Sequence, residues 1–152
     1  MDIKTFADLI DWTRQLHAHL AKCLAHCSSQ NENERARLLL DYLADHELKM
    51  EQMVAGFEQQ ADPKTLHTYI SGYLSNHPIN KLQASEAPYA TLGFDDICRE
   101  VLDYHEQIID LLRNLMGTAP IPEAKTLLDA LLDMEEHQAM LLAVQTGRMN
   151  DL

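Results

Sequence analysis

The chain has 152 residues, enough for one hydrophobic core, and its 12 basic and 24 acidic side chains give a formal net charge of −12. Such a surface repels nucleic acids and anionic membranes, so we expect neither as a partner. Apolar residues make up 46% of the sequence, whereas glycine and proline number five each. This composition excludes disorder and most all-β folds, and it predicts a single helical domain over residues 1–152.

The cysteines bear on the cellular compartment. Cys23, Cys27 and Cys98 form an odd number, and no charged-then-apolar leader precedes the first predicted helix. No apolar run approaches the roughly 18 to 20 residues that a membrane-spanning helix needs. We therefore expect a cytoplasmic protein without a disulfide framework.

The first half of the chain predicts two long helices, over residues 4–29 and 33–60, in which apolar side chains recur every three or four positions. Thr5 followed by Asp8 has the spacing of a capping box, and Asn31 followed by Glu34 repeats it before the second helix. Because the connection between the helices is so short, they are expected to form an antiparallel hairpin.

The second half predicts a short helix over 63–75, an irregular stretch over 78–93, and two more long helices over 94–117 and 121–147. Asp62 before Pro63 is typical of a helix start, and Gly117 and Gly147 are expected to end the two long helices. The fold class is therefore all-α. It is an up-down four-helix bundle with one long crossover, containing a short helix, between the second and third long helices.

This connectivity resembles the ferritin-like superfamily, which includes ferritins and rubrerythrins, along nearly the whole chain. The resemblance implies a di-metal centre held by a Glu from two helices and a Glu-x-x-His pair from each of the other two. The sequence departs from that pattern, since no glutamate precedes Glu32, the second helix reads Leu43-x-x-His46, and the fourth reads Glu135-x-x-Gln138. A degenerate site with one metal, or a scaffold without a metal, fits this sequence better than a standard di-iron oxidase.

Few polar side chains fall within the apolar stripes of the four helices. His46 lies inside the stripe of the second helix with Glu47 at its edge, His105 and Glu135 lie inside the third and fourth stripes, and His17 lies at the margin of the first. His17 precedes Asn31 by 14 positions and His46 follows it by 15, so both stand roughly 21 to 23 Å from the first hairpin turn. By the same reasoning His105 and Glu135 lie at mid-height of the second hairpin.

Four helices thus bring His17, His46, His105 and Glu135 to one central layer, a ligand set that suits Fe, Mn or Zn. The alternative is a metal-free core in which the histidines bond to one another, to Glu135, to Gln138 or to Tyr104. A redox metal would support oxygen or peroxide chemistry, whereas the alternative leaves a non-catalytic scaffold or protein-interaction module. Since nucleotide-binding and flavin motifs are absent, the sequence leaves open whether the protein is an enzyme.

Two other patterns of possible ligands occur in the sequence. His105 and Asp110 have the His-x4-Asp spacing found in hemerythrin-like proteins, but Ile109 stands where a second histidine would be needed. The first helix also carries a thiol and imidazole cluster, which one straight helix cannot wrap around zinc. We interpret its thiols as core filler and its imidazoles as solvated; its members are His19, Cys23, His26 and Cys27.

The sequence has more apolar surface than four helices need to close one bundle, which predicts a homodimer. Some of these apolar residues lie on a side flank of the third helix and the others in the crossover; they are Cys98, Leu102, Ile109 and Met116, and Tyr69, Ile70, Tyr73 and Leu74.

Overall fold

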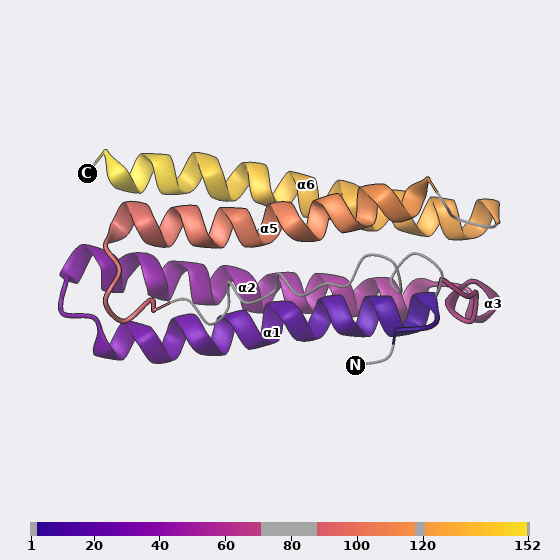
Figure 1. Ribbon diagram of the computed structural model, residues 1–152, viewed down its shortest axis with the longest axis horizontal. Helices are drawn as coiled ribbons and strands as arrows, with labels where there is room; N and C mark the ends of the chain where they lie inside the picture. The colour runs from indigo at the N-terminus through magenta and orange to yellow at the C-terminus, as the bar shows by residue number, and fades with distance from the viewer. Residues whose placement is uncertain (1–2, 71–87, 118–120, 152) are drawn as a thin grey trace.

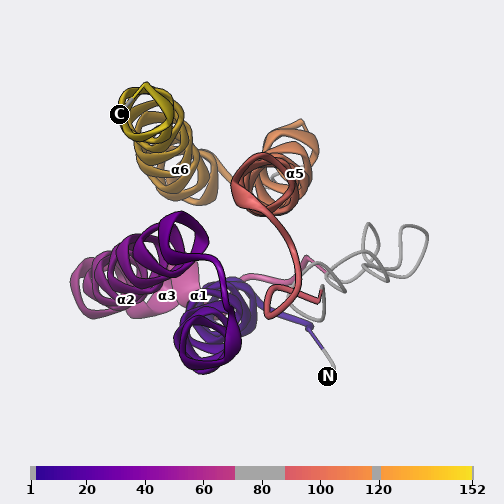
Figure 2. The ribbon, with the colours of Figure 1, turned by 90° about the vertical axis from the view of Figure 1, so that its left-hand side faces the viewer.

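The computed structural model describes residues 3–70, 88–117 and 121–151. These residues form the predicted all-α bundle, whose helices are α1 (Phe6–Gln30), α2 (Glu34–Gln60), α3 (Pro63–Leu66), α5 (Phe94–Met116) and α6 (Pro122–Asn150). The antiparallel pair α1 and α2 forms one layer, and the pair α5 and α6 packs on it as a second layer (Figures 1 and 2).

Helix ends follow the sequence signals where the partner atoms are local. Thr5 Oγ1 accepts a hydrogen bond from the Asp8 backbone N–H at 3.2 Å, and Asp8 Oδ2 accepts one from the Thr5 N–H at 3.1 Å, which completes the predicted capping box. Pro122 opens α6, and Gly117 caps the end of α5. These local contacts fix where the long helices begin and end.

The prediction that Asn31 caps the second helix is wrong. Asn33 has that role, because its side-chain oxygen accepts from the Ala36 N–H at 3.0 Å. Asn31 instead ends α1 and is buried, and its Nδ2 donates to the carbonyls of Tyr89 at 2.9 Å and Leu92 at 3.0 Å. Asn31 therefore ties the α1–α2 turn to the segment that leads into α5.

Replacing Asn31 by alanine is expected to destabilise the protein by about 1 to 3 kcal/mol, because buried carbonyls lose this donor. The free energy of unfolding from chemical denaturation measures the loss. Asn33→Ala is the matched control, since it removes only a helix cap and should cost about 1 kcal/mol. A loss for Asn31→Ala smaller than that of the control would contradict the tie between the two segments.

The short helix predicted over 63–75 ends at Leu66. Beyond it the chain is extended, because its backbone pairs with the segment before α1. The Phe6 N–H donates to the Thr68 carbonyl at 3.1 Å and the Ile70 N–H donates to the Lys4 carbonyl at 2.9 Å. A pairing partner far away in sequence thus replaces the helix at Thr68 to Ile70, and residues 71–75 of the prediction lie outside the described residues.

The fourth long helix does not stop at Gly147 but continues to Asn150. A glycine often ends a helix by entering the left-handed region, but Gly147 has no positive φ and stays helical. A Cβ atom at Gly147 would have no other atom within 4 Å, so no neighbouring group requires a glycine at this position. The last turn of α6 is therefore ordinary helix.

The two ends of the crossover lie at opposite ends of the bundle. In Figure 1, α3 lies at one end, whereas the start of α5 lies beside the α1–α2 turn at the other. As a result, α5 runs in the same direction as α2, and α6 returns beside it. This arrangement sets the middle of all four long helices at one level.

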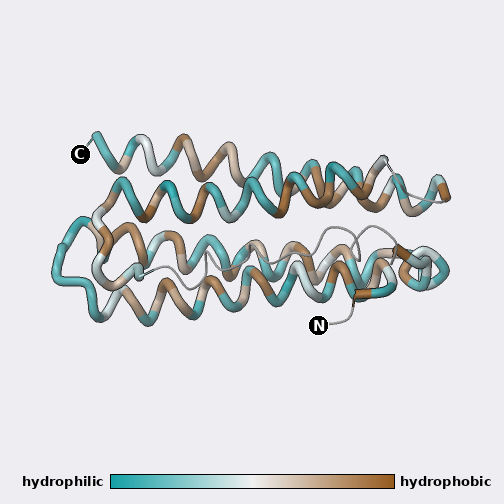
Figure 3. Tube along the Cα trace, viewed as in Figure 1, coloured by the Kyte–Doolittle hydropathy of each residue, from teal (hydrophilic) through white to brown (hydrophobic). Residues whose placement is uncertain are grey.

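The hydrophobic core runs along the bundle axis and is built from all four long helices. Hydrophobic and hydrophilic residues alternate along each helix in Figure 3, as expected for helices with one buried face. Fully buried examples are Leu9, Leu24, Leu43, Ile97, Leu112, Leu128 and Leu142. None of the described helices combines the length and apolarity needed to cross a membrane.

The surface predicted to join two copies is partly used within one chain. Ile109 and Ile70 are buried, whereas Tyr69 is 66% exposed. Cys98, Leu102 and Met116 are half-buried against the core, and residues 73 and 74 lie outside the described residues. The homodimer stays a prediction.

Candidate metal centre

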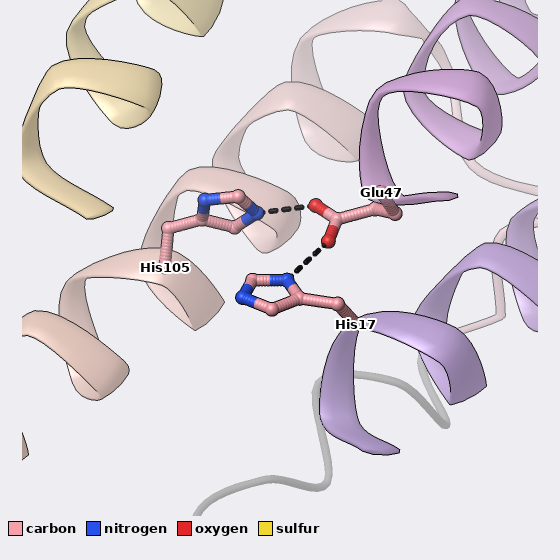
Figure 4. Close-up of side chains that lie close together, drawn as sticks. All are labelled: His17, Glu47 and His105. Atoms are coloured by element: carbon pink, nitrogen blue, oxygen red, sulfur yellow. Dashed lines mark hydrogen bonds and ion pairs between the residues drawn. The ribbon is translucent and has the colours of Figure 1, made fainter. Parts of the chain in front are cut away.

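Four ionisable side chains are fully buried in the middle of the bundle, one from each long helix. They are His17 of α1, Glu47 of α2, His105 of α5 and Glu135 of α6, and the exposed fraction of each is 0%. Figure 4 shows His17 and His105 converging on the carboxylate of Glu47. Burying an ionisable group without a partner costs free energy, so such groups are normally paired in a protein interior. The contacts among these four side chains therefore define the site.

Hydrogen bonds join the four side chains. His17 Nδ1 lies 2.6 Å from Glu47 Oε2, and His17 Nε2 lies 2.8 Å from Glu135 Oε1. His105 Nε2 bonds to the other oxygen of Glu47 (Figure 4). Because carboxylate oxygens accept, His17 donates from both ring nitrogens and is an imidazolium, while His105 donates from Nε2.

Charge reinforces these bonds. Burial alone would keep His17 neutral, but the carboxylates of Glu135 and Glu47 outweigh it and raise the pKa of His17 to about 10. Burial would likewise raise the pKa of Glu47, but His105 and His17 hold that pKa below its ordinary value. Glu47 is therefore an ionised carboxylate in a dry interior.

Two buried atoms of the cluster have no hydrogen-bond partner, namely Glu135 Oε2 and His105 Nδ1. His105 Nε2 bonds to Glu47, which leaves Nδ1 as the ring nitrogen that can bind a cation once it carries no proton. Glu135 Oε2 is an acceptor, and a buried polar atom without a partner is costly. A cation would satisfy both.

The spacing of the donor atoms also fits an ion. One ligand atom each from His17, Glu47 and His105 lie within 4.8 Å of one another. Imidazole nitrogen and carboxylate oxygen are the donors that iron, manganese and zinc use in proteins. The residues present therefore fit a metal, which would replace the protons that now hold the cluster together.

The structure brings together three of the four residues selected from the sequence, namely His17, His105 and Glu135. His46 lies beside them, and Glu47 occupies the central place on α2 although the sequence pattern put it at the edge of the stripe. A signal for Glu47 exists in its register, because it follows Leu43 by four residues and precedes Met50 by three, and both are buried.

His46 is half-buried and packs its ring between two others. Its centroid lies 6.4 Å from that of Tyr42 at an interplanar angle of 28°, and 6.2 Å from that of His105 at 32°. Neither ring nitrogen of His46 makes a hydrogen bond. Burial lowers the pKa of His46, so its imidazole is neutral and has a free lone pair. That any of these residues binds a metal stays a prediction.

With Glu47 at the centre, the comparison with the ferritin-like pattern changes. The carboxylates of Glu47 and Glu135 correspond to those of the two Glu-x-x-His pairs, but Met50 and Gln138 stand at the histidine positions. His17 and His105 in turn replace the two single glutamates. The site holds two imidazoles and two carboxylates, which leaves too few carboxylates to bridge two ions in the standard way.

The other sequence candidates lie away from the cluster. Cys23 Sγ lies 3.7 Å from Nε2 of the exposed His19. Asp110 is exposed and pairs with Arg113 at 3.2 Å. The hydroxyl of Tyr104 donates to the Leu16 carbonyl at 3.2 Å rather than to a histidine of the cluster. None of these groups completes a second ligand set.

Comparisons with known proteins identify the fold. No family model and no curated protein sequence matches the chain. A crystal structure from Thermotoga maritima, provisionally described as a ferritin-like diiron-carboxylate protein, is similar to it with a TM-score of 0.57. The two share 14% sequence identity over 93% of this chain and 94% of that one. The fold is therefore ferritin-like, as the sequence predicted.

Proposed function

We propose that this protein binds one metal ion in the middle of the bundle through His17, Glu47, His105 and Glu135. The observation that carries the proposal is the pair of buried atoms without hydrogen-bond partners, Glu135 Oε2 and His105 Nδ1. Iron is the metal we propose, because the similar structure from Thermotoga maritima is described as a diiron-carboxylate protein. A single ion is favoured because the cluster has only two carboxylates.

The chain's own residues would hold the ion and exclude water from it. When bound, iron would supply redox chemistry with oxygen or peroxide. Because all four ligands are fully buried, only small reactants of this kind would reach it. The pairing of both Glu47 oxygens with histidines on different helices fixes the carboxylate in position before the metal binds.

Elemental analysis of protein purified without an affinity tag tests the proposal. We expect about one iron per chain, lost in both His17→Ala and His105→Ala because each removes a ligand. His19→Ala is the matched control, since His19 is an exposed histidine on the same helix as His17, and it should keep the metal. Wild-type protein that stays folded and refuses added Fe, Mn and Zn would refute the site.

The second candidate is a scaffold that acts through its surface. It is favoured by three large apolar side chains exposed on α6, at Met140, Leu141 and Val144. In that case the histidines and glutamates would be a hydrogen-bonded core only. The metal analysis separates the two functions, because a scaffold without a site keeps its fold and binds no ion.

A further inference from the structure

The central cluster has no direct contact with solvent. Each of its four side chains is fully buried, so an ion that reaches them must first pass between the helices. On the side of α1, Thr13 is fully buried and donates to the Leu9 carbonyl of its own helix at 2.8 Å. The Tyr104 hydroxyl donates to the Leu16 carbonyl and so joins α5 to α1. The polar side chains on this flank thus already have partners.

A different arrangement is found on the side of α2 that faces α6. Four aromatic rings follow one another from the partly exposed Tyr42 through His46 and His105 to His17, with centroid separations of 6.4, 6.2 and 5.6 Å. His46 is the member of this series that stands between the surface and the cluster. It is also the one whose ring nitrogens both lack hydrogen bonds.

The surroundings of His46 suit a cation that is held for a short time. The side chain of Gln138, half-buried on α6, lies beside the His46 ring. A carboxamide oxygen and an imidazole nitrogen are both metal donors, yet together they are too few for a tight site. Beyond His46, the unpartnered Nδ1 of His105 is the next possible donor atom. The formal net charge of −12 attracts cations to the surface where such a route would begin.

We infer that His46 is a transit ligand, through which a divalent cation passes between α2 and α6 to the central cluster. The inference rests on the proposed function, since it assigns a route to that same site. His46 with Gln138 would hold the ion first, and His17, Glu47, His105 and Glu135 would then take it over. His46 is thus a positioning residue for loading and not a permanent ligand. It accounts for a buried histidine whose ring nitrogens make no well-formed hydrogen bond although Gln138 lies beside them.

The rate of metal uptake separates a transit ligand from a permanent one. Metal-free protein is mixed with Co²⁺, and the absorbance of the bound ion is followed by stopped flow. His46→Leu should take up Co²⁺ at least about tenfold more slowly than wild type, because the first donor on the route is gone. The final stoichiometry should remain one ion per chain, and the equilibrium affinity should stay within about threefold of wild type.

Two further variants complete the test. Gln138→Leu removes the second donor from the other helix and should also slow uptake, which keeps the test open if His46→Leu does not fold. His137→Leu, at an exposed position next to Gln138, is the matched control and should load at the wild-type rate.

Three results would overturn the transit role. Uptake by both His46→Leu and Gln138→Leu at the wild-type rate would exclude the route. Loss of bound Co²⁺ at equilibrium in His46→Leu would make His46 a permanent ligand. Wild-type protein that binds no Co²⁺, Fe or Zn would refute the proposed function itself, which is a different outcome from a change in rate alone.

Discussion

Replacing Glu47 by alanine is expected to destabilise the metal-free protein by about 3 to 5 kcal/mol, because it breaks a buried ion pair and leaves charge uncompensated. The two oxygens of Glu47 accept from His17 and from His105, so one substitution leaves ring N–H groups on two helices without an acceptor. The same change should abolish binding of one metal per chain. Chemical denaturation measures the first effect and elemental analysis the second.

Glu51→Ala is the matched control for this prediction. Glu51 lies one turn further along α2 and pairs with Arg14 at 3.3 Å, but both side chains are partly exposed. A pair of that kind contributes less than about 1 kcal/mol. If Glu47→Ala cost no more than Glu51→Ala, Glu47 would not be the centre of a buried ionic cluster.

The metal-free protein is expected to lose stability as the pH rises from about 6.5 to about 10, and metal should prevent that loss. The pKa of His17 is raised from 6.5 to about 10 by Glu135 and Glu47, against the effect of burial. A raised folded-state pKa stabilises the protein fully below the unfolded value, and the contribution disappears as pH passes the folded value. A bound ion takes the place of the proton, so it removes this dependence.

At acid pH, the stability of the metal-free protein is expected to change in the opposite direction, because it falls as the pH is lowered. The pKa of Glu47 is held below its ordinary value of 4.5, so its contribution is present above that pH and is lost as the pH falls below it. Melting temperatures across this pH range, with and without Zn²⁺, measure both limbs. Glu47→Gln should flatten the alkaline limb of the metal-free protein, because His17 loses one of its two anionic partners. Identical alkaline slopes with and without Zn²⁺ would show that no ion replaces the His17 proton.

The sequence by itself determined the four long helices, because the signals for them are local. Apolar residues recur at helical spacing, Thr5 caps α1 through backbone atoms within a few residues, and Pro122 stands in the first turn of α6. The number of residues between each side chain and its hairpin turn then gives the height of that side chain along the bundle. For this reason the sequence alone places His17, His105 and Glu135 in one layer.

Only the tertiary structure decided which groups face one another. His46 and Glu47 are neighbours about 100° apart on α2, and the apolar pattern allows either to point inward, so the packing of the two hairpins selects the rotation that buries Glu47. Asn31 has a capping signature as good as that of Asn33, yet its side chain donates to the carbonyls of Tyr89 and Leu92, which lie 58 and 61 positions away in the sequence. Thr68 to Ile70 leave the helix to pair with the chain before α1. In each case the deciding partner is distant in sequence, and no local pattern contains it.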